Sequence, residues 1–157
     1  MGKGGLVLEN IGKGFEMVDI SWKETSRRKA IAKGWIRLKR ETIDAIRSGS
    51  VVKGDVLTVA KVSATLAVKK TPEIIPGCHP IPITHVAIEF QIEDDRISAM
   101  CKVASESKTG VEMEALTGVA IALLTIWDMV KEIEKDEKGQ YPHTIIESII
   151  VESKVKE

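Results

Sequence analysis

The chain has 157 residues, of which 43% are hydrophobic and 29% are charged, a composition typical of one globular domain with its own core. Its 23 basic and 23 acidic side chains cancel, so overall charge selects neither nucleic acid nor a membrane surface as a partner. Two cysteines, Cys78 and Cys101, are too few for a disulfide framework. We expect no signal peptide, and the longest uncharged run, Ala115–Trp127, is too short to cross a bilayer. A cytoplasmic protein is therefore predicted.

The first third of the chain is expected to hold a short edge strand and a helix. Residues 1–14 are rich in Gly and Lys and are predicted to be a flexible N-terminal arm, ahead of a single domain over residues 15–152. Phe15–Ile20 is predicted to be the edge strand. From Ser26 to about Ser48 apolar residues recur at helical spacing, and Gly49 is expected to end this helix. Its apolar face comprises Ile31, Trp35, Leu38 and Ile46, so Trp35 is expected in the core.

A second helix is predicted to begin at Asp55, a residue that suits the N-cap position. Small or apolar residues follow on one face, namely Val56, Val59, Ala60, Ser63 and Ala67. Pro72 and Pro76 are expected to end this helix. Three prolines among residues 76–82 then predict a stiff, extended loop.

Two strands and a long helix are predicted next. Residues 86–92 and 97–103 alternate apolar with polar or small side chains, and Glu93–Asp95 is expected to join them as the turn of a β-hairpin with one buried face. Cys101 falls on the apolar face and is expected to be a core thiol. Thr109 and Glu112 have the spacing of a capping box, so a helix is predicted from Thr109 to about Lys135.

The end of the chain is predicted to add one more strand. A turn is expected at Gly139–Pro142 and a strand over Thr144–Val151, while residues 153–157 are expected to form a loose tail. The predicted element order is therefore β-α-α-β-β-α-β. Strands in mainly antiparallel pairing, with helices on one face, define an α+β fold.

The proline-rich loop is the first candidate for chemistry. It holds His79 directly after Cys78, in a segment that cannot easily move. A histidine that bonds only to backbone is an equally good explanation. Cys78 is a weak candidate nucleophile, because adjacent side chains in an extended segment point in opposite directions. His79, His85 and the two cysteines show no metal-ligand spacing, so no metal site is predicted.

The long helix carries no charge between Glu114 and Asp128. Such a helix is buried in a core or an interface, and charges held at its ends need partners or a function. The capping box accounts for Glu112 but not for Glu114. Asp128 and Lys131 share a helix face at i, i+3. This spacing is compatible with a simple ion pair and also with a lysine poised for proton transfer or phosphate binding.

Helix length keeps these charges apart. Glu114 and Asp128 are separated by about 21 Å at 1.5 Å per residue, so they cannot both contact one reacting atom from the same chain. Small residues between them suit a helix–helix contact with a neighbouring subunit that completes the site: Ala115, Gly118 and Ala122. Several cations could gather into a basic pocket, namely Arg28, Lys53, Lys69, Lys70 and Lys131. Lys53 is the strongest of them, because Gly54 lets a ligand approach the backbone closely.

Five segments of the chain are similar in order and spacing to one known family, from about residue 15 to residue 150. They are Met17–Ser21, Lys53–Val56, Ile75–Pro80, Lys108–Thr117 and Thr125–Lys131. Together they resemble the MoaC family, the cyclic pyranopterin monophosphate synthases of molybdenum cofactor biosynthesis. The resemblance implies a ferredoxin-like α+β fold, in which helices pack on one face of an antiparallel sheet. It also implies a homohexamer, a trimer of dimers, with sites at subunit interfaces.

The resemblance implies a reaction as well. The family converts a 3′,8-cyclised dihydro-GTP into cyclic pyranopterin monophosphate and releases diphosphate, so a lyase with a small-molecule substrate is expected. No cofactor is expected, although Mg²⁺ could bind the diphosphate. Catalytic positions of the family match Lys53, Asp128 and Lys131. Substrate-binding positions match Gly77, Cys78, His79, Met113, Glu114, Arg28 and Glu112, and Gly77 stands where relatives carry a bulkier residue, often Leu.

Other functions remain open on the sequence. A non-catalytic nucleotide- or pterin-binding oligomer is the main alternative, and the presence of Lys53, Asp128 and Lys131 argues against it. A structural oligomer whose long helix is only an interface is another. A zinc-dependent pterin enzyme is disfavoured, because metal-ligand spacing is missing. Neither nucleic acid nor a membrane is expected as a partner.

Overall fold

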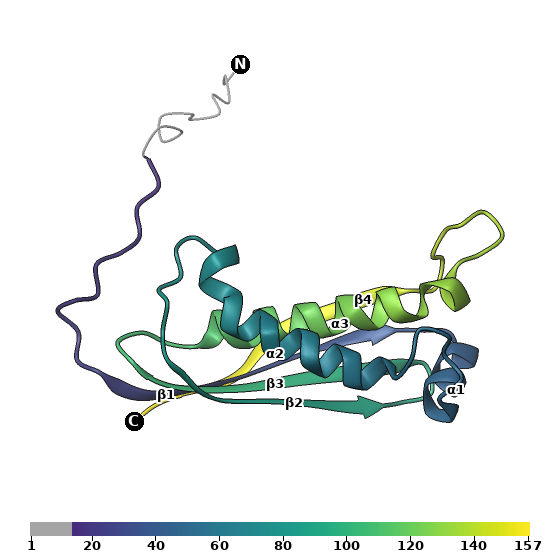
Figure 1. The fold of residues 1–157 in the computed structure, drawn as a ribbon, viewed down its shortest axis with the longest axis horizontal. Helices are drawn as coiled ribbons and strands as arrows, with labels where there is room; N and C mark the ends of the chain where they lie inside the picture. The colour runs from purple at the N-terminus through teal and green to yellow at the C-terminus, as the bar shows by residue number, and fades with distance from the viewer. Residues whose placement is uncertain (1–13) are drawn as a thin grey trace, which may run out of the picture.

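A four-stranded antiparallel sheet, covered on one face by two long helices, forms the protein (Figure 1). The structure is a computed structural model that describes residues 14–157. Its elements are β1 (Ser26–Arg37), α1 (Arg40–Ser48), α2 (Val56–Ile74), β2 (Ile83–Ile92), β3 (Arg96–Ser107), α3 (Glu112–Glu134) and β4 (Ile145–Lys156). The strand order is β2-β3-β1-β4, and all neighbours are antiparallel. This is the ferredoxin-like arrangement, so the predicted α+β class and the hairpin are confirmed. The order of helices and strands also agrees with the prediction, although the first strand is a different segment from the predicted one.

The first strand lies where a helix was predicted. Ser26–Arg37 forms β1 near the middle of the sheet, and only Arg40–Ser48 is helical. Gly49 ends that helix with a φ of 70°, as expected. Alternate residues of β1 are buried beneath the helices: Ala30, Ala32, Gly34 and Ile36. Burial of every second residue is typical of a strand. Three of these four residues are small, so their alternation is a weaker signal in the sequence than the helical spacing of the larger apolar side chains.

Trp35 lies on the face of the sheet that the helices leave uncovered. It is half-buried, and the Lys33 ammonium sits 5.2 Å from the centroid of its ring. The prediction that Trp35 packs in the core was therefore wrong, because neighbouring residues of a strand point to opposite faces. The predicted edge strand was wrong too, since Phe15–Ile20 has no regular secondary structure.

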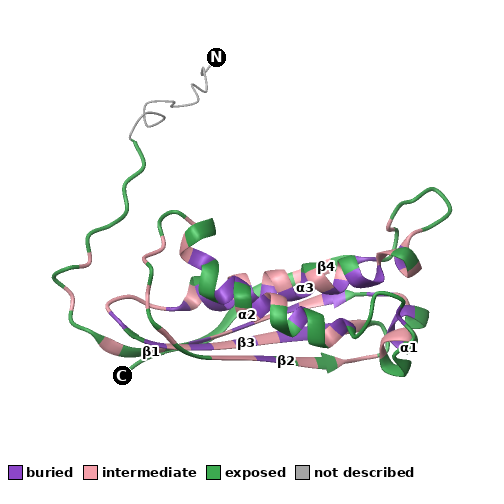
Figure 2. Cartoon of the chain, viewed as in Figure 1, coloured by how far each residue is buried: buried purple, intermediate pink, exposed green. Residues whose placement is uncertain are grey.

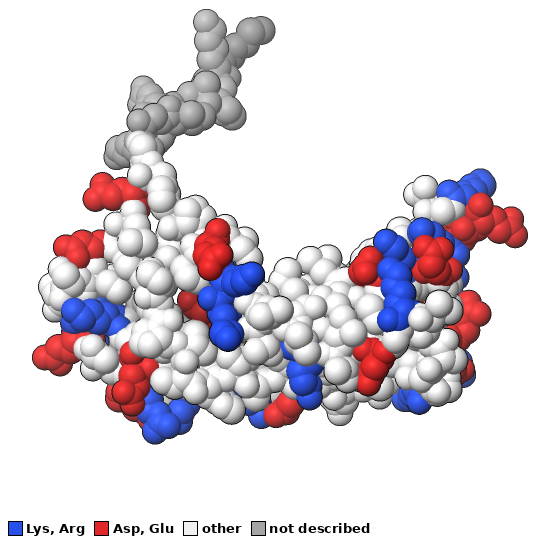
Figure 3. All heavy atoms as spheres, in the orientation of Figure 1, with Lys and Arg blue, Asp and Glu red and all other residues white. Residues whose placement is uncertain are grey.

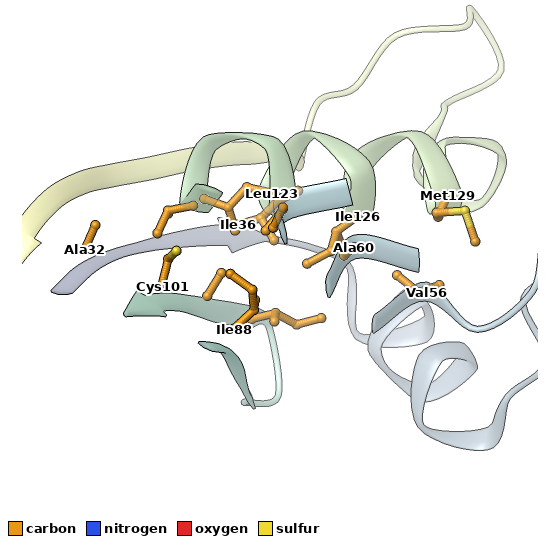
Figure 4. Packing of buried hydrophobic residues seen from close by; sticks show 14 of the residues in the cluster. Ala32, Ile36, Val56, Ala60, Ile88, Cys101, Leu123, Ile126 and Met129 are labelled. Carbon is orange, nitrogen blue, oxygen red and sulfur yellow. The ribbon is translucent and has the colours of Figure 1, made fainter. Parts of the chain in front are cut away.

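The helices α2 and α3 lie side by side on the sheet and bury the core between them and it (Figures 2 and 4). Gly118 makes this packing possible, since a Cβ there would lie 2.7 Å from Cys101 Sγ of β3 and 2.8 Å from Val68 Cγ2 of α2. Ala115 and Ala122 are fully buried inside the same chain. The prediction that these small residues form a subunit contact was therefore wrong.

Cys101 is the core thiol that the hairpin pattern predicted. Its side chain is fully buried, and burial raises its pKa to about 12. A thiol with such a pKa stays protonated at neutral pH and is a poor nucleophile.

The boundaries of the long helix differ from the capping-box prediction at one end. The helix α3 begins at Glu112, and its N-cap residue Val111 offers no side-chain cap, so Thr109 is not the N-cap. It ends at Glu134, close to the predicted end. Within residues 14–157, α3 is the one helix long and apolar enough to cross a membrane, yet half of its most apolar stretch is buried in this fold. Such burial is typical of a core helix.

The ends of α2 and β4 also extend further than predicted. Asp55 caps α2 as expected, and its Oδ1 accepts a hydrogen bond from Thr58 N at 3.1 Å. Pro72 lies inside the last turn without ending the helix, because a proline there removes only one backbone hydrogen bond. The tail predicted to be loose belongs to β4, which pairs with β1 up to Lys156. The predicted arm lies outside the described residues, apart from Gly14.

We expect Gly118→Ala to destabilise the protein by about 1–3 kcal/mol, although Ala favours helices more than Gly does. The added methyl group would overlap Cys101 and Val68. Urea unfolding of the variant and the parent measures the change in free energy of unfolding. The double variant with Cys101→Ala should lose less than the sum of both single variants, since removing the sulfur opens space. Additive losses would contradict the steric explanation.

Candidate functional site

The predicted catalytic residues meet near the C-terminal end of α3. We name Lys53, Asp128 and Lys131 the lysine cluster. Lys53 Nζ lies 3.3 Å from Asp128 Oδ2 and donates to the Asp128 carbonyl oxygen at 2.8 Å, while Lys131 Nζ lies 3.0 Å from Asp128 Oδ1. Hydrogen bonds from Lys131 and from Lys53 hold the pKa of Asp128 below its ordinary value. One carboxylate on the surface is thus held between two ammonium groups.

Local structure explains how Lys53 reaches α3. Lys53 lies in the loop between α1 and α2, where Val51 is buried and Gly54 has a φ of 118°. Because side chains rarely adopt this φ, a glycine allows the turn that directs Lys53 toward Asp128. The simple ion pair predicted for Asp128 and Lys131 is present, and a second lysine from another element joins it.

The predicted substrate-binding residues gather at the other end of α3. All of them except Arg28 line a cavity of about 280 Å³, which we name the loop pocket. Its lining comprises Gly77, Cys78, His79, Thr109, Gly110, Glu112, Met113 and Glu114. His79 Nε2 donates to the Val18 carbonyl oxygen at 2.6 Å, so the backbone-bonding explanation of this histidine holds for that nitrogen. A Cβ on Gly77 would lie 3.8 Å from the Phe15 ring, an ordinary contact that leaves room for the larger side chain of relatives.

Burial controls the acid–base properties of the loop pocket. Glu114 is only 3% exposed. Burial raises the pKa of its carboxyl group, and the charge of Glu112 raises it further. Burial, followed by the charge of Glu114, raises the pKa of the Cys78 thiol. This thiol is therefore less reactive than an ordinary one, which argues against Cys78 as a nucleophile.

A smaller cavity of about 250 Å³ adjoins the loop pocket and shares Gly110 and Glu112 with it. We name it the cation pocket, because Arg28, Lys29, Lys154 and Lys156 line it. Lys156 pairs with Arg28, and Lys154 with Ala30, across the β1–β4 ladder. Directly paired residues point to the same face of a sheet, so Arg28, Lys154 and Lys156 point toward the side that α3 covers.

Ion pairing inside the cation pocket is incomplete. Lys154 Nζ lies 2.8 Å from Glu112 Oε1. Burial would raise the pKa of Glu112, but its contact with Lys154 and the charge of Arg28 hold that pKa below its ordinary value. Arg28 Nε is buried and has no hydrogen-bond partner among the described residues. The pocket thus keeps an unused donor beside three lysines, which is what a bound anion needs.

Three lysines of the cation pocket were not predicted from the sequence, namely Lys29, Lys154 and Lys156. The alternation in Ser153–Lys156 was a strand signal, but its charges suggested a solvated tail. Thr109 and Gly110 of the loop pocket were missed as well. Of the predicted cations, Lys69 and Lys70 line neither pocket. Among residues 14–157, no three His, Cys, Asp or Glu side chains gather as a metal ion would require.

One chain does not bring its two groups of candidate residues together. Along α3, Glu114 and Asp128 are about 21 Å apart. Figure 3 shows charged side chains mostly toward the two ends of the molecule, with few in the middle of the face it presents. Lys53 and Lys131 therefore cannot reach a ligand atom in the loop pocket of the same chain.

The similarity of this chain to known proteins extends over both the lysine cluster and the loop pocket. The MoaC family matches residues 17–156. A Thermococcus kodakarensis protein named probable cyclic pyranopterin monophosphate synthase is 60% identical over 144 residues, which are 92% of this chain and 92% of the relative. A relative of the same name from Pyrococcus abyssi is 60% identical, over 92% of this chain and 91% of the relative. Another from Aeropyrum pernix is 58% identical, over 91% of this chain and 98% of the relative. The chain belongs to the MoaC family.

Proposed function

We propose that this protein is a cyclic pyranopterin monophosphate synthase of molybdenum cofactor biosynthesis. It converts (8S)-3′,8-cyclo-7,8-dihydroguanosine 5′-triphosphate into cyclic pyranopterin monophosphate and diphosphate, as a lyase. The lysine cluster carries this proposal, since Lys53, Asp128 and Lys131 are all present and in contact. About 60% identity to relatives with this name supports it.

The two pockets suit different parts of this substrate. In the proposal, the loop pocket takes the guanine-derived ring, whose adjacent N–H groups can donate to the buried carboxyl group of Glu114. The cation pocket takes phosphate groups, because Arg28, Lys154 and Lys156 offer charge-assisted hydrogen bonds to their oxygens. The two pockets adjoin at Gly110 and Glu112, so a substrate that fills both can bind in one orientation, with its ring in the loop pocket and its phosphates in the cation pocket.

The lysine cluster suits the chemical steps. Opening and re-forming rings requires groups that give and take protons, and ammonium groups held by Asp128 can supply them. The cyclic phosphate forms when a sugar hydroxyl attacks the α-phosphorus, while the bond to the diphosphate oxygen breaks. Positive charge from Lys53 and Lys131 stabilises that departing oxygen. The proposed reaction uses no redox cofactor, and any Mg²⁺ would bind the diphosphate.

A homohexamer, arranged as a trimer of dimers, is part of the proposal, because each site needs both ends of α3. A neighbouring subunit can bring its lysine cluster to the loop pocket of this one. Exposed apolar residues at i, i+3 and i+7 of α2 support such a contact, namely Val59, Val62 and Leu66. A cytoplasmic location also fits, because the substrate derives from GTP and both cysteines are free thiols.

We expect Lys131→Ala to lower turnover by roughly 10²- to 10⁴-fold, because a group that moves protons or stabilises charge is lost. Release of diphosphate from the cyclised dihydro-GTP measures this, and light scattering measures oligomer size. The oligomer should be unchanged, and Lys138→Ala, an exposed lysine in the next loop, should leave turnover unchanged. A Lys131→Ala protein that assembles differently but keeps its turnover would favour a structural oligomer. Binding without turnover in the parent would favour the non-catalytic alternative.

Mixing two inactive variants tests whether subunits share a site. We expect Lys131→Ala and Glu114→Gln to be inactive alone, and a mixture refolded together at equal amounts to recover about a quarter of parental turnover. Recovery occurs because some interfaces then combine an intact lysine cluster with an intact loop pocket. Mixing either variant with itself is the control. A mixture that exchanges subunits yet stays inactive would mean that one chain supplies the whole site.

Glu114 should make stability depend on pH. Its pKa is raised in the folded chain, so the unfolded chain ionises it more easily, and stability falls as pH rises from the ordinary glutamate pKa through the folded value. Glu114→Gln lacks this loss. The melting temperature of the variant, relative to the parent, should therefore rise between about pH 4 and neutral pH. A difference that is the same across this range would contradict the raised pKa.

A further inference from the structure

Glu134 forms a buried polar cluster that the proposed function does not use. It is the last residue of α3, and its side chain is fully buried. Its carboxyl oxygens accept hydrogen bonds from the Lys39 backbone N–H at 3.1 Å, from the Thr42 hydroxyl, and from the Thr144 hydroxyl at 2.7 Å. A buried carboxyl group with several donors holds the elements that bear them in one relative position.

The cluster joins the start of α1 to the end of α3. Lys39 is the N-cap residue of α1, and its side chain forms no cap. Glu134 accepts from the Lys39 backbone N–H, one of the N–H groups at this helix start that have no partner within the helix. In return, Lys39 Nζ donates to the Ile133 carbonyl oxygen at 3.1 Å, one of the free carbonyls at the end of α3. Each helix end is thus capped by a residue of the other.

These contacts fix the start of a short segment that leads to Lys53. The helix α1 has nine residues and buries only Thr42 and Ile43. Gly49 ends it, and the loop of residues 50–55 follows, held by buried Val51 and by a hydrogen bond from Gly54 N to the Val51 carbonyl at 3.1 Å. The segment starts beside Glu134 and returns to α3 at Asp128, about 9 Å back along the helix.

We propose that Glu134 is a positioning residue for Lys53, because it fastens α1 to the end of α3 and so sets where the following loop presents the Lys53 ammonium to Asp128 and Lys131. The proposal rests on the proposed function only in assigning chemistry to the lysine cluster. Asp128 is itself a local probe of Lys53, because a hydrogen bond from Lys53 helps to keep its pKa low.

Carbon-13 NMR titration of the Asp128 carboxyl group tests the geometry without any assay of turnover. We expect the pKa of Asp128 to rise in Glu134→Gln and to rise further in Glu134→Ala, as it does in Lys53→Ala. Gln is the milder change, since its amide keeps one acceptor for Lys39 and one donor for a threonine hydroxyl. Glu134→Gln should add nothing in the Lys53→Ala background. Glu137→Gln, an exposed glutamate three residues on, is the control that should change nothing.

Turnover gives the second readout. We expect kcat to fall on the order of 10- to 100-fold in Glu134→Ala, less in Glu134→Gln, and KM to change less than kcat, because a misplaced lysine slows the chemical step. An Asp128 pKa equal to that of the parent in both variants would overturn the proposal, even if both are less stable. An unchanged kcat beside a shifted Asp128 pKa would overturn it too. Failure of the proposed function would appear instead as a parent without turnover, with the NMR comparison still valid.

Discussion

The close contact of α3 with β3 and α2 at Gly118 fixes the position of the helix that carries Glu114, Asp128 and Lys131. Because residue 118 has no side chain, the helix packs directly on Cys101 and Val68. This packing holds the helix in one position on the sheet. A straight helix cannot bring its two ends together, so Glu114 and Asp128 face different regions of the molecule. The division into a lysine cluster and a loop pocket follows from the length of this helix. A complete site then requires a second copy of the chain, as the proposed function assumes.

Two buried carboxyl groups at opposite ends of α3 illustrate how burial can serve different purposes. Glu134 is surrounded by donors from α1 and from Thr144, so it holds elements together. Glu114 lies in a pocket, and its pKa is raised because burial outweighs the help it receives from backbone hydrogen bonds. A carboxyl group left in that state lowers stability at neutral pH, which is tolerable where a ligand supplies the missing partners. The same residue type is thus structural at one end and a candidate for substrate binding at the other.

Much of the fold could be predicted from local signals. The cap at Asp55, the hairpin around Glu93–Asp95 and the long apolar helix were confirmed, because each depends on residues close together in the sequence. Ser26–Arg37 was misjudged because its inward positions carry Ala and Gly, which fit either period. Residues 153–156 were misjudged because an edge strand exposed to solvent can carry several charged side chains. Both errors concern strands whose identity depends on pairing with each other.

By itself, the sequence determined the family resemblance and the residues of its motifs, since short segments with fixed spacing carry that information. It also determined that opposite ends of one helix could not share a reacting atom, since helical rise depends on residue number alone. Only the tertiary structure decided that Lys154 meets Glu112, 42 residues away, and that Lys39 meets Glu134, 95 residues away. Such contacts depend on strand register and on how the helices pack on the sheet. They could not be predicted from the sequence, because a hydrogen bond between distant segments leaves no periodic pattern in either segment.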